Sequence, residues 1–157
     1  MTNQPVYPSV SIPASEGAER VWLGRPSSGD GTCRGGYAIP VVERLGNRCA
    51  YCDRDLFAPY EDWLNLSVDH IVPRNAAAAG IPVEWIEDLL NDVPCCRACN
   101  EFLARYQVTV RAPDDIAGFV ALRDSTLTAK RIHALGRHRI EHERFDAWQR
   151  KRIGRSR

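Results

Sequence analysis

The sequence contains no run of 18 apolar residues, so it predicts no membrane-spanning helix. Its first 20 residues lack a basic region followed by an apolar stretch, and we therefore expect no signal peptide. Both absences favour a cytoplasmic location. Histidine is scarce as well. His70 is the only histidine in the first 132 residues.

The charged residues are unevenly distributed along the chain. Of its 157 residues, 44% are hydrophobic and 26% are charged, which is typical of one globular domain. The net charge is only +1, but residues 129–157 contain ten basic and three acidic residues, a net charge of +7. This asymmetry is consistent with a basic segment that binds nucleic acid or an acidic surface of a partner protein. On charge alone, a solvated helix face is the better explanation of the pattern.

Six cysteines in a chain without an export signal argue against a disulfide framework. Four of them form two CxxC pairs, Cys49 with Cys52 and Cys96 with Cys99, and 43 residues separate the pairs. This spacing predicts a structural Zn²⁺ site with four thiolate ligands. A thiol redox centre needs only one CxxC pair and would leave the second unexplained. Two cysteines remain outside the predicted site: Cys33 and Cys95.

The hydrophobic pattern predicts a mixture of helices and strands. We expect short helices over residues 39–46 and 81–90, a strand over 65–72, and a helix near Cys99. Residues 108–113, VTVRAP, are typical of a further strand. Capping and stop signals divide the C-terminal part into three helices: residues 116–123, 125–136 and 138–154.

Three segments follow from these patterns. Residues 1–37 hold many Pro, Gly and Ser residues without any regular period, which predicts an irregular N-terminal arm. Residues 38–107 are expected to form a small zinc-held α+β centre. Residues 108–157 are expected to form a helical, basic C-terminal extension.

Asp69 and His70 lie at the end of the predicted strand, which Pro73 closes. The paired cysteines would hold this strand end near the helix that starts at Cys96, so that Asn100 comes close to it. Oxygen ligands for a divalent cation and an imidazole base are the components of a single-metal phosphodiesterase site. Without the flanking cysteines, Asp69 and His70 would be better explained as a polar pair that closes a strand.

Three motifs together resemble the HNH nucleases, which are also called ββα-metal or His-Me finger nucleases. They are CAYC at residues 49–52, VDHIVPR at 68–74 and NDVPCCRACN at 91–100. The resemblance covers about residues 39–107, under half of the chain. It implies an α+β fold with a zinc-held ββα-metal core, similar to a treble clef, to which C-terminal helices are added.

The resemblance implies a role for each matching polar residue. His70 corresponds to the general base that takes a proton from the attacking water. Asp69 and Asn100 correspond to the two protein ligands of a catalytic Mg²⁺ or Mn²⁺. Asn91 corresponds to the residue that braces the loop and the histidine. The resemblance implies no role for Arg74, and we hypothesise that this residue binds a substrate phosphate.

The resemblance therefore implies a metal-dependent endonuclease that hydrolyses phosphodiester bonds in DNA, and it leaves RNA open as a substrate. The alternative is a non-catalytic zinc module that binds nucleic acid or protein through its basic C-terminal segment. Adjacent strand residues point to opposite faces, so Asp69 and His70 can serve one site only if the strand bends or ends there. Pro73 indicates that it ends there, and we expect an irregular backbone over 69–72. His138 and His142 lack a third metal ligand, and we expect them on a solvated helix face.

Overall fold

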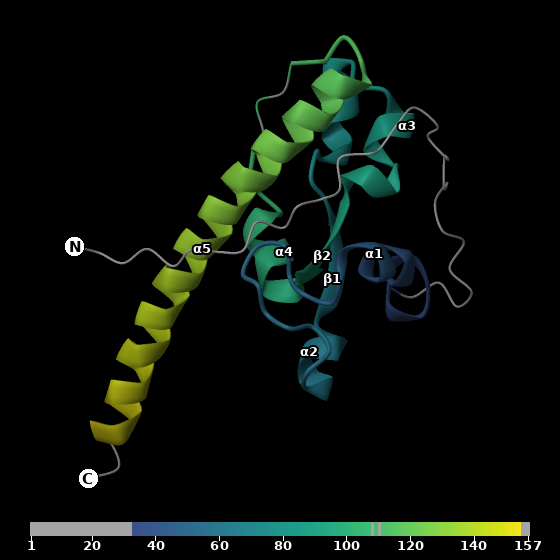
Figure 1. Cartoon of the computed structure of the whole chain (residues 1–157). Coiled ribbons are helices and arrows are strands. Elements are labelled where there is room, and N and C mark those ends of the chain that lie inside the picture. The colour runs from purple at the N-terminus through teal and green to yellow at the C-terminus, as the bar shows by residue number, and fades with distance from the viewer. Residues whose placement is uncertain (1–32, 108, 110, 155–157) are drawn as a thin grey trace, which may run out of the picture.

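The computed structural model describes residues 33–107, 109 and 111–154 (Figure 1). Within these ranges two strands form a small sheet among helices, as the predicted α+β class requires. The strands are β1 (Leu66–His70) and β2 (Asp92–Cys96). The helical elements are η1 (Cys33–Tyr37), α1 (Ala38–Leu45), α2 (Tyr60–Leu64), η2 (Arg74–Ala79), α3 (Val83–Ile86), η3 (Leu89–Asn91), α4 (Arg97–Leu103) and α5 (Ile116–Gly154).

The sheet is antiparallel, and its register pairs Leu66 with Cys96 at one end and His70 with Asp92 at the other. The elements η2, α3 and η3 lie in the long connection between the two strands. Helix α4 begins directly after β2, and the amide of Arg97 donates to the carbonyl of Asn65, 2.8 Å away. The order is therefore strand, long connection, strand and helix, and the start of α4 is held against the residue that precedes β1.

The local predictions for this central unit are confirmed in part. Helix α1 matches the predicted helix over 39–46 and stops at Gly46, whose φ of 85° suits glycine. Strand β1 is shorter than the predicted strand over 65–72. The predicted helix over 81–90 is wrong beyond Ile86, because the Asp88 carboxylate accepts from the amide of Leu90 and starts a separate 3₁₀ turn there.

The three predicted C-terminal helices are wrong, because α5 is a single helix of 39 residues. Ser125 begins the predicted helix over 125–136, and Thr128 lies in its first turn. Instead their hydroxyls donate to the carbonyls of Leu122 and Asp124, at 2.8 and 3.0 Å, within the helix. A glycine in a helix interior costs about 1 kcal/mol relative to alanine, which a long and partly buried helix tolerates. Gly136 therefore does not end α5.

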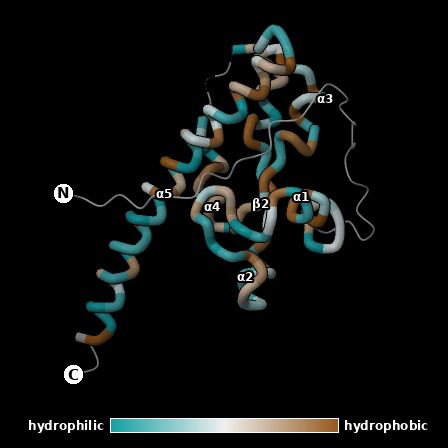
Figure 2. Tube along the Cα trace, in the orientation of Figure 1, coloured by the Kyte–Doolittle hydropathy of each residue, from teal (hydrophilic) through white to brown (hydrophobic). Residues whose placement is uncertain are grey.

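The first half of α5 packs on the core, and its second half extends away from it (Figure 1). Phe119 and Lys130 are buried, and the buried Arg123 donates to the carbonyl of Leu90, 3.0 Å away. Phe145 and Trp148 are each 55% exposed. Along this second half, hydrophobic residues are isolated among hydrophilic ones (Figure 2). The first half of α5 therefore covers the core, and its second half is a charged helix that extends into solvent.

Two clusters of buried side chains form the core. The first surrounds the sheet and the CxxC pairs, and it includes Tyr51, Leu66, Ile71 and Val93. The second lies beneath the connection between the strands and consists of Val72, Ala76, Ile81, Ile86 and Phe119. Since Phe119 comes from α5, this helix completes the second cluster.

Several predictions fall on residues outside the described ranges. The predicted N-terminal arm lies there except for residues 33–37, which form η1. Residues 108 and 110 of the predicted strand VTVRAP also lie outside, and residues 109 and 111–113 are not in a strand. In the part of the chain that the structure describes, no helix is long and apolar enough to cross a membrane.

We predict that Phe119→Ala lowers the free energy of unfolding by about 3–5 kcal/mol, because it leaves a cavity where α5 meets the second cluster. Phe145→Ala on the same helix is the matched control, and its effect should stay within about 0.5 kcal/mol because that ring is exposed. Urea denaturation of both variants measures the difference. Equal losses would contradict the packing role of the first half of α5.

Candidate functional site

The two CxxC pairs come together as predicted. The sulfur atoms of Cys49, Cys52, Cys96 and Cys99 all lie within 4.8 Å of one another. The Sγ atoms of Cys52 and Cys96 are 3.8 Å apart. Three of the four residues are buried, and Cys52 is half-buried. The cluster could hold one metal ion, and its location joins the turn before α2 to the start of α4.

Backbone hydrogen bonds shape the two halves of this cluster. In the first half, the amide of Cys49 donates to the carbonyl of Arg54, 2.9 Å away, and Asp53 adopts a φ of 62° to close the turn. In the second half, the amide of Cys99 donates to the sulfur of Cys96, 3.5 Å away. The amide of Ala50 links the halves through the carbonyl of Pro94 in β2. The thiols are therefore placed by backbone that is itself hydrogen-bonded.

The electrostatics of the cluster suit a cation. The contact with Cys49 lowers the pKa of the Cys52 thiol, whereas contacts with Cys49, Cys52 and Cys96 raise the pKa of Cys99. Thiolates packed this closely repel one another, and a divalent cation among them would offset the repulsion. Four cysteines without other donors are a ligand set typical of structural Zn²⁺. Zinc therefore fits the residues present.

The remaining cysteines lie outside the cluster. Cys33 is half-buried in η1, and its thiol contacts the carbonyl of Leu66 at 3.6 Å. Cys95 precedes a cluster member in β2, but its side chain is buried and burial raises its thiol pKa. Successive strand residues point to opposite faces, which explains why Cys96 joins the cluster and Cys95 does not.

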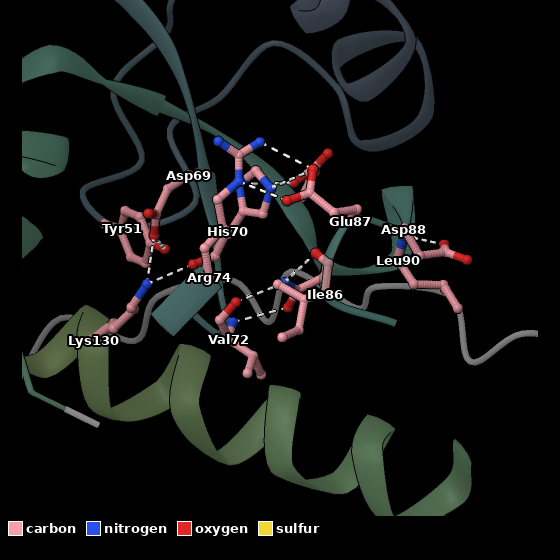
Figure 3. Close-up of polar contacts among 12 residues, drawn as sticks. Tyr51, Asp69, His70, Val72, Arg74, Ile86, Glu87, Asp88, Leu90 and Lys130 are labelled. Atoms are coloured by element: carbon pink, nitrogen blue, oxygen red, sulfur yellow. Dashed lines mark hydrogen bonds and ion pairs between the residues drawn. The ribbon is translucent and has the colours of Figure 1, made fainter. Parts of the chain in front are cut away.

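Asp69 lies in a buried polar contact that the sequence did not predict (Figure 3). Its Oδ2 accepts hydrogen bonds from the hydroxyl of Tyr51 and from Nζ of Lys130, the latter at 2.7 Å. Lys130 also donates to the backbone carbonyl of His70, 2.8 Å away. The lysine side chain is 3% exposed and that of Asp69 is 16% exposed. The pair fastens α5 to β1.

The imidazole of His70 has acidic neighbours of its own (Figure 3). Its Nδ1 lies 3.4 Å from Oδ1 of Asp92, and its Nε2 lies 3.8 Å from Oε2 of Glu87. Burial, aided by the charge of Arg74, lowers the pKa of His70 below its ordinary value. The imidazole is therefore neutral at pH 7, and its side chain keeps 22% of its surface exposed.

Arg74 is held by Glu87 and is not a free phosphate ligand. Its Nε and one terminal nitrogen donate to the two carboxylate oxygens of Glu87, at 2.7 and 3.0 Å. The arginine side chain nevertheless remains 54% exposed. A phosphate would have to share or displace the glutamate to bind this guanidinium.

Asn91 is fully buried and braces the connection between the strands. Its Oδ1 accepts from the amide of Val72, and its Nδ2 donates to the carbonyls of Val72 and Ile86, all at 2.8 Å. The carbonyl of Asn91 also accepts from the amide of Ile71. These contacts fix the backbone immediately after His70 without involving any exposed group.

Asn100 approaches β1 from α4. Its Nδ2 donates to the hydroxyl of Ser67, 2.8 Å away. Residues 67 and 69 share one face of the strand, whereas His70 points to the other. Asn100 and Asp69 are therefore associated with the same face, but they use their polar groups on different partners.

The predicted irregular backbone over 69–72 is wrong for its first half. Asp69 and His70 are both in the regular register of β1, opposite Val93 and Asp92. The bend begins at residue 71, after the strand has ended. In consequence the two side chains have separate neighbours. Asp69 contacts Tyr51 and Lys130. His70 lies beside Glu87 and Asp92.

Sequence reasoning missed Tyr51, Glu87, Asp92 and Lys130. Tyr51 lies between two cysteines and Asp92 follows Asn91, so both could have been considered from their positions in the motifs. Glu87 and Lys130 carried no local signal. Lys130 is 61 residues from Asp69 in sequence, and only the docking of α5 brings it there.

Comparisons of the chain with protein-family models, with curated proteins and with solved structures found no match. What this site can do chemically therefore follows from its own residues.

We predict that the purified chain binds one Zn²⁺ and that Cys96→Ser removes it, since three sulfur ligands with one hydroxyl hold zinc more weakly. Zinc content measured by atomic absorption should fall, and the thermal midpoint should fall with it. Cys33→Ser is the matched control because Cys33 lies outside the cluster, and it should keep the metal. Loss of zinc from both variants equally would contradict this assignment.

We also predict a pH-dependent effect of Asp92→Asn. Burial raises the pKa of Asp92 to about 7, whereas an aspartate in an unfolded chain ionises near pH 4. Between these values the folded state holds a proton that the unfolded state has lost, so this group destabilises the fold progressively as the pH rises. The variant should match the wild type at pH 4 and exceed it by up to about 4 kcal/mol at pH 8.

Urea denaturation across this range measures the effect of Asp92→Asn. The control is Asp146→Asn, an exposed position on α5, which should reproduce the wild-type pH profile. The prediction would be wrong if the free energies of unfolding of Asp92→Asn and the wild type differed by the same amount at every pH. That result would mean that folding does not change the pKa of Asp92.

Proposed function

We propose that this protein is a zinc-stabilised, metal-dependent endonuclease of the HNH type that hydrolyses phosphodiester bonds in DNA. The observation that carries the proposal is the unit formed by β1, the long connection, β2 and α4, with the cysteine cluster joining residues 49–52 to the start of α4. This is the order of elements that a zinc-held ββα-metal core needs. Of the motifs that resemble the family, VDHIVPR spans the end of β1, and NDVPCCRACN spans β2 and the start of α4. CAYC lies in the turn that the cysteine cluster joins to them.

His70 has the properties that a general base requires. Its pKa is lowered by burial, so the imidazole is neutral and able to accept a proton at pH 7. The neighbouring Asp92 faces Nδ1, and a proton on Nδ1 would leave Nε2 as the basic atom. In the proposed reaction Nε2 takes the proton of the attacking water, and the Asn91 contacts keep the adjoining backbone fixed.

The proposed catalytic cation is Mg²⁺ or Mn²⁺, with Asp69 and Asn100 as its protein ligands. Because Asp69 and His70 point to opposite faces of β1, the proposal requires the end of this strand to rearrange when the cation and DNA bind, so that both side chains reach one phosphate. Both residues keep one oxygen that is not used in the contacts described above: Oδ1 of Asp69 and Oδ1 of Asn100. Hard cations prefer such carboxylate and amide oxygens. When bound, the cation would stabilise charge on the phosphate and on the leaving oxygen. Lys130 would then lie beside the same carboxylate and add a positive charge.

A second function is favoured by a specific observation. Asp69 already has two donors, Tyr51 and Lys130, and this buried ion pair explains the residue without any second metal. A non-catalytic zinc module, with the exposed basic half of α5 as its binding surface, would need no more than this. Residues 137–154 contain six basic and three acidic residues, which gives this surface a net charge of +3. Phosphate backbones and acidic proteins both suit such a surface.

We predict that the wild-type protein cleaves plasmid DNA with Mg²⁺ or Mn²⁺ and that His70→Ala lowers the rate by about 10²–10⁴-fold, the usual contribution of a general base. Gel analysis of nicked and linear plasmid measures the rates, and single-stranded DNA and RNA are tested beside it. His142→Ala is the control, because His142 is exposed on the projecting half of α5. The zinc content of the wild type and of both variants is measured, and the rates are compared only for proteins that retain zinc.

The two candidate functions differ in this experiment. Binding of DNA without cleavage in either cation, by protein that retains zinc, would reject the endonuclease and leave the binding module. Cleavage that persists in His70→Ala would reject His70 as the base.

A further inference from the structure

A histidine from α5 reaches the cysteine cluster. The Nε2 atom of His138 lies 3.2 Å from the sulfur of Cys99, although 39 residues separate the two in sequence. Among the described residues, the four cysteines form the group whose potential ligand atoms all lie close to one another. His138 does not belong to this group, so we do not count it as a metal ligand. The contact is therefore between an imidazole and a sulfur that already belongs to the metal site.

The surroundings of His138 hold its ring in this position. Its ring makes an edge-to-face contact with the ring of Phe102 in α4, with 5.0 Å between the ring centres and an angle of 83° between the planes. The guanidinium of Arg137 lies over the same phenyl ring, 5.7 Å from its centre. The histidine is half-buried, while His142 one turn later is exposed. The imidazole is thus oriented by packing and does not project freely into solvent.

We propose that His138 donates a hydrogen bond from Nε2 to the zinc-bound thiolate of Cys99 and so fastens α5 to the metal centre. Four thiolates around one Zn²⁺ leave a net charge of −2, and a donor aimed at a sulfur stabilises that excess charge. Groups that hydrogen-bond to metal ligands in this way commonly change metal affinity by about 10- to 100-fold. The proposal does not depend on nuclease activity.

This contact has a structural consequence for the other end of the docked helix. Lys130, which binds Asp69, precedes His138 by eight residues, or about 12 Å of helix. Between Lys130 and His138, α5 is therefore fastened at both ends, by an ion pair to β1 and by the proposed hydrogen bond to the zinc centre. Zinc occupancy then contributes to keeping Lys130 beside Asp69, and the projecting half of α5 begins where the second contact ends.

The first test measures zinc release from the full-length chain to a chromogenic chelator. His138→Leu removes the donor but keeps a large side chain, and it should release zinc at least about 10-fold faster. His138→Gln offers an amide N–H in its place and should restore part of the difference. His142→Leu is the matched control and should behave as the wild type. A wild-type release rate for His138→Leu would overturn the proposal.

The second test uses the wild-type protein and does not depend on how the variants fold. With ¹¹³Cd in place of zinc, a weak scalar coupling between the metal and the Hε2 proton of His138 is expected through the hydrogen bond to sulfur. Absence of that coupling, with the ring proton observed, would overturn the proposal. A strong direct coupling from the metal to Nε2 would also overturn it, because His138 would then be a ligand.

Discussion

The rest of the structure depends on the four-cysteine cluster. A sheet of two five-residue strands is too small to be stable by itself, and the helices around it are mostly short. The cluster joins the turn at residues 49–52 to the end of β2 and the start of α4, which are distant in sequence. With these segments joined, Tyr51, Leu66 and Val93 share one buried cluster around the sulfur atoms. A bound zinc ion would therefore stabilise the fold itself, because its ligands come from two segments that are distant in sequence and are otherwise joined by few contacts, such as the hydrogen bond from Ala50 to Pro94.

The contact between Asp69 and Lys130 is the second constraint, and it changes how the Asp-His pair is understood. Both groups are largely buried, and removing either partner alone would leave an uncompensated charge. The pair therefore holds α5 on β1, whatever else Asp69 does. An endonuclease site that includes Asp69 must use its remaining oxygen and must operate beside a fixed ammonium group. His70 points to the opposite face of β1 and lies beside Glu87 and Asp92. The side chains of Asp69 and His70 are therefore in different environments.

Helix α5 connects these environments. Phe119 completes the second core cluster, Arg123 and Lys130 bind backbone or carboxylate groups of the central unit, and His138 reaches the cysteine cluster. Beyond that point the helix projects from the body with exposed aromatic and basic residues (Figure 1). A segment that looked like an appended basic tail is, over its first half, part of the structure that encloses Asp69. Its second half keeps the charge that suits a nucleic acid or an acidic partner.

The sequence alone determined the cysteine cluster, α1, the core of β1 and the start of α4. These depend on local spacing and on signals such as Gly46 that act within a few residues. It also singled out Asn91, whose amide makes three hydrogen bonds that hold the backbone after His70. Only the tertiary structure decided that α5 is continuous and that Lys130 lies on Asp69. Helix-stop signals are weak when a long helix is held by packing, and a buried ion pair across 61 residues leaves no local pattern. For the same reason, the strand period placed Asp69 and His70 on opposite faces, but only the packing of α5 and of the connection between the strands decided what each face contains.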